Sequence, residues 1–124
     1  MHRFIHSFRF ALRGLEMVWR AEQNFRIQVV ALAMALALAA ILRVRAWEWT
    51  AILLVGGAVL VLECTNSAVE RLADFVQPRL HGYVRDVKDA MAGAVLIASV
   101  VAAAIGIIIL TPYIVSAIVH QWLG

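Results

Sequence analysis

The sequence contains few charged residues, a single cysteine and two prolines among its 124 residues. The lone cysteine, Cys64, excludes an intrachain disulfide and a cysteine-based zinc site. Charged residues make up 15% and hydrophobic residues 64%, whereas globular domains carry about 25% charged residues. The length suits one domain, residues 1–124. The composition therefore predicts a small, single-domain membrane protein.

The common nucleotide and metal motifs are missing as well. The sequence has no Walker A pattern, no glycine-rich kinase loop and no histidine motif of the metalloproteases. Any nucleotide must therefore be held by helix ends and a loop. The formal net charge of +3 could suggest nucleic acid, but the basic residues cluster beside apolar runs, where they typically set membrane topology. We expect no nucleic-acid partner.

Three long apolar runs are present, and each predicts a spanning helix because about twenty residues cross a bilayer. The first run is interrupted only by Gln28, and a short loop with interfacial tryptophans at 47 and 49 follows it. Pro112 is expected to mark a kink or the end of the membrane portion. The expected helices cover about 24–43, 49–75 and 88–119.

Ala37-Leu38-Ala39 offers a different interpretation of the first run, as a signal peptide with a cleavage site. The segment before this run carries two glutamates and has an amphipathic pattern of its own, so it matches a leader poorly.

The N-terminal segment 2–20 has the pattern of an amphipathic helix. Aromatic and aliphatic residues recur at helical spacing, and arginines fall largely on other faces. This pattern is typical of a helix lying on a membrane surface, and a plain membrane anchor is the alternative.

The distribution of basic residues predicts the orientation in the membrane. Five of the eleven precede residue 27, two lie in 43–48, four lie in 71–89 and none follow Pro112. Because cytoplasmic segments carry the excess of lysine and arginine, the N-terminus and the 71–89 segment are expected in the cytoplasm. The C-terminus is expected on the outer side.

Glu63, Asn66, Glu70 and Asp74 are spaced by three, four and four residues, which places them on one face of a helix. Glu63 lies fourteen residues beyond Trp49, or about 21 Å along the helix, which leaves it roughly 9 Å inside the cytoplasmic edge. A carboxylate at this depth is costly and usually functional. Near a lipid alcohol, Glu63 could act as a general base.

Further acidic and basic groups are expected near the cytoplasmic surface. Glu70 lies about 10 Å beyond Glu63, in a region suited to Mg²⁺ bound by one or two carboxylates and phosphate oxygens. Glu22, at the start of the first span, could be the second ligand. Lys88-Asp89 adds a cation for phosphates and another acid. Together these groups suit phosphoryl transfer.

Structural roles for the same residues are the alternatives. Glu63 and Glu70 could be polar packing residues paired with arginines, and Asn66 could serve as a hydrogen-bonding contact between helices. His81 would by default be a solvated loop residue.

The motif Glu63-x-x-Asn66-Ser-Ala-Val-Glu70-x-x-x-Asp74, followed by His81 and Lys88-Asp89, resembles the prokaryotic small membrane lipid kinases, the diacylglycerol kinase and undecaprenol kinase family. Glu22-x-Asn24-Phe25-Arg26 is similar to that family as well. The resemblance covers about residues 3–110. It implies three spans with an N-terminal surface helix, a homotrimer with active sites between protomers, and a bacterial inner-membrane location.

The resemblance also implies ATP-dependent phosphorylation of a membrane alcohol with Mg²⁺. Glu63 matches the catalytic base, and Glu22 and Glu70 match the metal-binding carboxylates. The implied nucleotide contacts are Arg3, Phe10, Glu22, Glu70, His81, Lys88 and Asp89. The implied lipid-binding or supporting residues are Asn24, Phe25, Arg26, Trp49, Asn66 and Asp74. The whole 24–28 segment and Trp49 fall where the family lines its lipid site.

The sequence departs from the diacylglycerol kinases in two places. Arg79 and Leu80 stand where these enzymes commonly have Glu-Tyr before the loop histidine, and Phe10 stands where they carry a tyrosine. The opening from Arg3 to Phe8, Gly14 and Pro78 is more similar to the undecaprenol kinases. We expect undecaprenol as the acceptor, with a diacylglycerol kinase as the alternative and a non-catalytic trimeric membrane module as an alternative of another class.

Overall fold

The computed structural model describes residues 1–76, 79 and 81–123, which fold into four helices without a strand among them. Pro78 and Leu80, singled out in the sequence, lie outside the described residues. The helices are α1 (His2–Ala21), α2 (Gln23–Leu42), α3 (Ala46–Val76) and α4 (His81–Leu123). The fold is all-α, as the apolar runs predicted.

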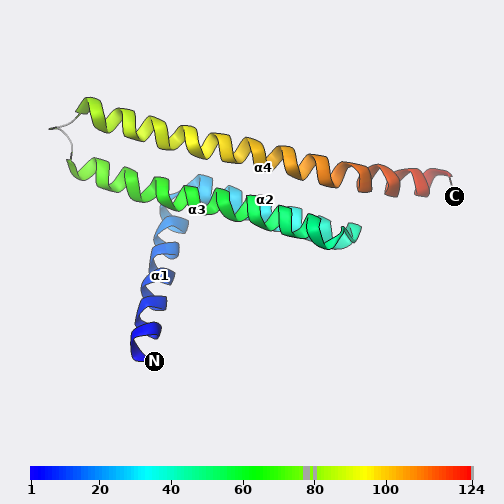
Figure 1. Cartoon of the computed structure of the whole chain (residues 1–124), viewed down its shortest axis with the longest axis horizontal. Helices are drawn as coiled ribbons and strands as arrows, with labels where there is room; N and C mark the ends of the chain where they lie inside the picture. The colour runs from blue at the N-terminus through cyan, green and yellow to red at the C-terminus, as the bar shows by residue number, and fades with distance from the viewer. Residues whose placement is uncertain (77–78, 80, 124) are drawn as a thin grey trace.

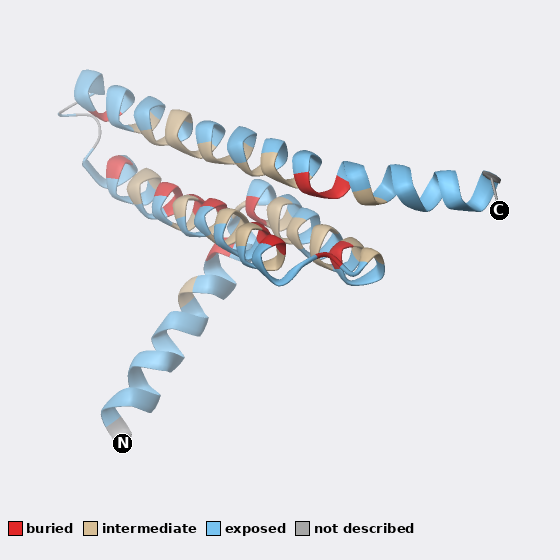
Figure 2. Cartoon of the chain, turned by 45° about the vertical axis from the view of Figure 1, so that its right-hand side comes forward, coloured by how far each residue is buried: buried red, intermediate tan, exposed pale blue. Residues whose placement is uncertain are grey.

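Three of the four helices, α2, α3 and α4, are long and apolar enough to cross a membrane. α3 and α4 form a long antiparallel pair, and α2 packs beside α3, whereas α1 projects away from the bundle (Figure 1). Buried residues lie mainly where these three helices face one another, and most residues on their outer faces and on α1 are exposed (Figure 2). Helices suit a bilayer because they satisfy their backbone hydrogen bonds internally.

A tight corner joins α1 to α2, and Glu22 is the one residue between them. Its backbone is extended, and its N–H donates to the Val18 carbonyl at 2.8 Å. The Arg26 guanidinium donates to the carbonyls of Trp19 and Arg20 at 2.8 and 3.2 Å, which satisfies carbonyls that the end of α1 leaves free. These hydrogen bonds thus fix the position of the Glu22 backbone between the two helices.

The turn between α2 and α3 is equally well defined. Arg43 has a left-handed backbone at φ 53°, a conformation that commonly ends helices. The Glu48 carboxylate accepts the Arg45 N–H at 2.8 Å, which caps the start of α3. It also accepts the Tyr113 hydroxyl of α4 at 2.6 Å. Apolar residues pack beside this turn: Ala39, Val44, Ile52, Ile109 and Leu110.

Three helix boundaries differ from the expectation by more than one residue. α3 begins at Ala46 instead of residue 49, so Trp47 and Trp49 lie in its first turn and not in the preceding loop. The reason is the Glu48 cap, which allows the helix to begin three residues earlier.

The second difference is the start of α4 at His81, seven residues before the expected position. Residues 81–89 contain no proline, Val84 is buried and Lys88 bonds to α3, so tertiary contacts support the extra turns. Lys88-Asp89 therefore lies two turns into α4 and does not open it. α4 also continues through Pro112 to Leu123, beyond the expected end at residue 119.

Candidate functional site

One face of α3 carries a set of buried polar residues. Glu63 has 2% of its surface exposed, Asn66 has 8% and Ser67 has none. Glu70, one turn beyond Asn66, is half-buried, while Asp74 is exposed. The 3.6-residue period brings Glu63, Asn66, Ser67 and Glu70 to the side of α3 that faces the rest of the bundle. A buried carboxylate requires a hydrogen-bond donor, and α2 supplies one to Glu63.

Glu63 receives its hydrogen bond from α2. The Gln28 side-chain amide donates from Nε2 to the Glu63 carboxylate at 3.3 Å. The other end of this amide, Gln28 Oε1, is buried and has no partner among the described residues. Glu63 is thus held by a side chain that keeps one unused acceptor.

The other two candidate carboxylates are held at the same turn of α3. The Ser67 hydroxyl donates to Glu22 at 3.0 Å, and the Asn66 amide donates to Glu70 at 3.4 Å. Because Asn66 and Ser67 are consecutive, these bonds bring Glu22 and Glu70 to the same part of α3. The Asn66 carbonyl oxygen is buried and has no partner in the described part of the chain.

Lys88 and Asp74 form an ion pair between α4 and α3, with 2.6 Å between Nζ and the carboxylate oxygen. The pair lies one turn beyond Glu70 along α3, and both side chains are partly exposed to solvent. The lysine ammonium has three donors, so the pair with Asp74 leaves hydrogens for a further anion.

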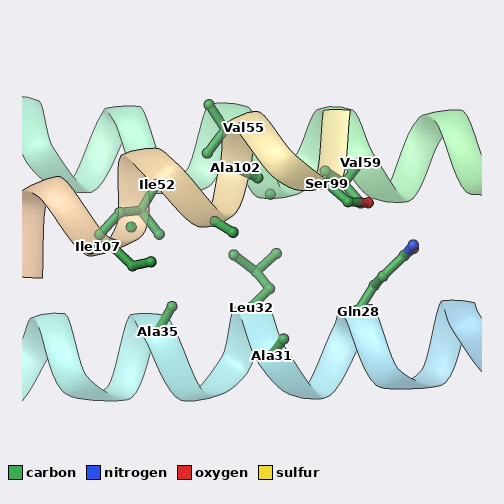
Figure 3. A pocket seen from close by; sticks show the side chains of 13 residues that line it. Gln28, Ala31, Leu32, Ala35, Ile52, Val55, Val59, Ser99, Ala102 and Ile107 are labelled. Carbon is green, nitrogen blue, oxygen red and sulfur yellow. The ribbon is translucent and has the colours of Figure 1, made fainter. Parts of the chain in front are cut away.

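An apolar cavity of about 370 Å³ lies between α2, α3 and α4. Figure 3 shows Gln28 and Ser99 toward one end of it, near Val59, and Ile52 and Ile107 toward the other. Glu63 lies one turn beyond Val59 and is bonded to Gln28. The lining residues are Gln28, Ala31, Leu32, Ala35, Ile52, Val55, Gly56, Val59, Ser99, Ala102, Ala103, Gly106 and Ile107. The cavity therefore has one polar end, and that end lies beside the buried carboxylate.

Arg3 and Phe10 are not brought to this site. Both are exposed on α1, which contacts α2 and α3 but not α4 among the described residues. The Phe10 ring lies 5.1 Å from the His6 ring and 5.9 Å from the Arg13 guanidinium. His81, at the start of α4, is exposed beside an open depression that Arg79, Tyr83 and Asp86 also line.

The supporting residues predicted on α2 have structural contacts. Phe25 is buried and packs edge-on against Trp19, with the ring centroids 6.4 Å apart, and Arg26 caps α1. Asn24, like Asp89 on α4, is exposed. Trp49 packs against the apolar cluster near the α2–α3 turn, about 21 Å along the helix from Glu63.

Sequence reasoning missed Ser67, which was quoted within the motif without a role. Gln28 was included only as part of the 24–28 segment that the resemblance implies for the lipid site. As a polar residue in an otherwise apolar run, Gln28 is expected to face a partner, but this signal does not identify Glu63. Ser67 lies among other polar residues, and nothing in the sequence identifies Glu22 as its partner.

The donor set fits a hard cation such as Mg²⁺. No cluster of three or more histidine, cysteine or acidic side chains able to hold a metal occurs in the described part of the chain. Mg²⁺ commonly takes only one or two carboxylates and completes its shell with phosphate oxygens and water. Glu22 and Glu70, with the unpartnered Asn66 carbonyl oxygen near Glu70, match this requirement.

Comparison with known proteins gives a consistent result. The family model for prokaryotic diacylglycerol kinase matches residues 9–110. An undecaprenol kinase of Bacillus subtilis (strain 168) is 33% identical over 112 residues, which cover 90% of this chain and 91% of that protein.

Two proteins named diacylglycerol kinase are also similar. The one from Synechocystis sp. is 32% identical over 114 residues, or 91% of this chain and 65% of that protein. The one from Helicobacter pylori (strain J99) is 32% identical over 85 residues, or 68% of this chain and 66% of that protein. These names describe catalysts, which favours an enzyme over a non-catalytic membrane module. The chain belongs to the prokaryotic diacylglycerol kinase family, and it is a lipid kinase, an ATP-dependent phosphotransferase.

Proposed function

We propose that the protein transfers the γ-phosphate of Mg·ATP to the hydroxyl of a single-hydroxyl membrane lipid, with undecaprenol as the favoured acceptor. The main supporting observation is the position of Glu63, which is buried beside the polar end of an apolar cavity and bonded to Gln28. An apolar cavity with few polar groups suits a ligand that is mostly hydrocarbon.

Glu63 serves as the general base in this proposal. It takes the proton of the lipid hydroxyl as the hydroxyl oxygen bonds to the γ-phosphorus and the bond from this phosphorus to the ADP oxygen breaks.

Glu22 and Glu70 would hold Mg²⁺, since Ser67 and Asn66 orient their carboxylates at one turn of α3. When bound, the ion neutralises charge on the phosphate oxygens. We assign nucleotide contacts to Lys88, Asp89 and His81. Arg3 and Phe10 would reach a nucleotide only if α1 swings toward the bundle or belongs to a site shared with another protomer.

The choice of acceptor is supported by the relatives. The undecaprenol kinase matches over nearly its full length, while about two thirds of each diacylglycerol kinase is covered. Phe10 and Arg79 also depart from the pattern common among diacylglycerol kinases. Diacylglycerol remains the alternative acceptor because it presents a primary alcohol at a similar depth.

We further propose a homotrimer with shared sites in a bacterial inner membrane, with α1 lying on the cytoplasmic surface. Asp89, His81 and most of α1 are exposed in the single chain, which leaves them accessible to a neighbouring protomer. The excess of basic residues at the N-terminus and in 71–89 supports the cytoplasmic assignment. Crosslinking in nanodiscs would test the trimer, and a dominant monomer with full activity would contradict it.

The central experiment is a phosphate-transfer assay in nanodiscs with Mg·ATP, offering undecaprenol and diacylglycerol separately. We expect faster transfer to undecaprenol and almost none by Glu63→Gln. A preference for diacylglycerol would show that undecaprenol is not the favoured acceptor, and it would leave the proposed phosphate transfer unchanged. Transfer to neither lipid would contradict the proposed function.

A further inference from the structure

α4 continues past the end of the bundle, as its C-terminal part in Figure 1 shows. The Tyr113 hydroxyl bonds to Glu48, which also accepts the Arg45 N–H, so Tyr113 lies level with the α2–α3 turn. Ten more helical residues follow, which make about 15 Å of helix. Every side chain from 114 to 122 is exposed. Residues 114–123 are called the tail of α4 below.

The tail is apolar on one side although it lies outside the bundle. It contains no aspartate, glutamate, lysine or arginine. At about 100° of turn per residue, Ser116 and His120 fall on one side of the helix. Five apolar side chains fall on the other side, within an arc of about 140°: Ile114, Val115, Ile118, Val119 and Trp122. The tail therefore has an apolar face that no other described part of the chain covers.

The turn beside Tyr113 places the tail outside the hydrocarbon core. Arg43 and Arg45 belong to this turn, and arginine is costly inside the core, so the turn lies at a membrane surface. The tail begins at that level and extends away from the bundle. Sliding α4 along α3 would draw the tail into the core, but the side-chain bonds of Tyr113 and Lys88 hold α4 against α3. The apolar face must therefore be covered at the surface.

Lipid suits this face better than a second copy of the chain. A helix seam between copies is a narrow stripe that repeats over three or four heptads, whereas the tail has a wide face and only about one and a half heptads. Trp122 is typical of the membrane–water interface, where an indole meets apolar chains and polar headgroups. Because the tail lacks lysine and arginine, apolar burial and not attraction to anionic lipid should hold it there.

Pro112 stands just before the tail, inside α4. Proline has no backbone N–H, so the carbonyl of Ile108, four residues earlier, loses its helical hydrogen bond. Sharp bends in helices commonly occur at proline for this reason. α4 is therefore easiest to bend where the tail would have to turn toward the membrane.

We propose that the tail is an interfacial anchor. α4 bends at Pro112, and the tail lies along the membrane surface opposite Glu70, with its apolar face among acyl chains and headgroups and with Ser116 and His120 toward water. The anchor sets the depth of the bundle in the bilayer from the end remote from the candidate site. The proposal goes beyond the lipid kinase reaction and does not depend on it, so failure of the phosphate-transfer assay would not affect it.

Spin-label accessibility in phosphatidylcholine nanodiscs tests the anchor. Ile118→Cys and His120→Cys place a nitroxide on the apolar and the polar face, each in a Cys64→Ala background that leaves one reactive thiol. The label on Ile118→Cys should be several-fold more accessible to oxygen, which concentrates in lipid, than to a water-soluble nickel chelate. The order should reverse for His120→Cys. Circular dichroism establishes that each variant is folded.

The other outcomes would overturn the anchor. High nickel accessibility at both positions would show a tail that projects into water. High oxygen and low nickel accessibility at both would show a tail submerged in the core. Low accessibility to both reagents at Ile118→Cys, together with dipolar broadening between labels, would show that a second copy covers the face.

A second measurement keeps Cys64. The difference in fluorescence between the wild type and Trp122→Phe isolates the signal of Trp122. Lipid brominated in the upper acyl chain should quench this signal strongly, and aqueous acrylamide should quench it weakly. The reverse order would contradict the anchor.

Pro112→Ala tests the bend. Alanine restores the N–H that can bond to the Ile108 carbonyl, which stiffens α4, so the contrast in accessibility between Ile118→Cys and His120→Cys should diminish. Thr111→Ala, at the exposed neighbouring position, is the control and should preserve the contrast. An undiminished contrast in Pro112→Ala would overturn the part of Pro112 in the proposal.

Discussion

The hydroxyl of Ser67, which has no exposed surface, donates a 3.0 Å hydrogen bond to the carboxylate of Glu22. This bond joins the middle of α3 to the corner where α1 ends and α2 begins. It connects residues 45 positions apart in the chain, so it depends on the packed fold and not on local sequence. Ser67 therefore controls where a candidate metal ligand lies.

Replacing this serine should affect metal-dependent nucleotide binding. We expect Ser67→Ala to raise KM for Mg·ATP and the Mg²⁺ concentration at half-maximal rate several-fold, because Glu22 loses the donor that orients it. A hydrogen bond to a charged group typically stabilises a protein by about 1.5–3 kcal/mol, so the unfolding temperature should also fall. Thr65→Ala, at an exposed position of α3, is the control. An unchanged Mg²⁺ titration in folded Ser67→Ala would remove the positioning role.

The base assignment predicts a selective loss of turnover. Glu63→Gln preserves size but cannot accept the hydroxyl proton, so we expect kcat to fall by a factor of about 10² to 10⁴. Binding of Mg·ATP, measured by calorimetry, should stay within a factor of two or so. Glu16→Gln, on exposed α1, makes the same change away from the site. A kcat near the wild-type value would exclude Glu63 as the base.

Two adjacent glycines in α3 test whether the cavity receives the lipid chain. A Cβ on Gly56 would overlap a terminal carbon of the Leu32 side chain, whereas one on Gly57 would meet nothing within 4 Å. Gly56→Ala should therefore displace the Leu32 side chain, which lines the cavity, and raise KM for the lipid several-fold.

Gly57→Ala serves as the control for this change and should have little effect on lipid binding. KM for Mg·ATP should remain the same in both variants, because the altered volume lies away from Glu22 and Glu70. Equal lipid kinetics for the two alanine variants would show that the chain binds elsewhere.

The bond between Tyr113 and Glu48 predicts a change in stability without a change in chemistry. Tyr113→Phe leaves Glu48 with only the Arg45 N–H among its observed donors, so the unfolding temperature in detergent should fall by a few degrees. Activity per folded molecule should match the wild type, because the bond lies at the opposite end of α3 from Glu70. Tyr83→Phe, at an exposed residue of α4, should leave the unfolding temperature unchanged. A large loss of kcat in Tyr113→Phe would show that this end of the bundle participates in turnover.

The sequence allowed the three apolar helices and the polar face of α3 to be predicted, because helical periodicity and run length depend on local spacing alone. It did not reveal that Gln28 bonds to Glu63 or Ser67 to Glu22, since these pairs depend on which helix faces meet. The start of α4 was placed too late for the same reason: Val84 and Lys88 are supported by contacts with α3 that no local pattern records. The metal and nucleotide roles stay predictions.

Two side-chain bonds connect α3 to α4 near opposite ends, Asp74 with Lys88 and Glu48 with Tyr113. The bonded positions are 26 residues apart on α3 and 25 apart on α4, or about 39 and 38 Å of helix. Because the two lengths agree, sliding one helix past the other by a turn, about 5.4 Å, would break both bonds at once. These two bonds therefore fix the register of α3 against α4 along the helix axes. Movements during catalysis should then be rotations or tilts of the α3–α4 pair as a unit.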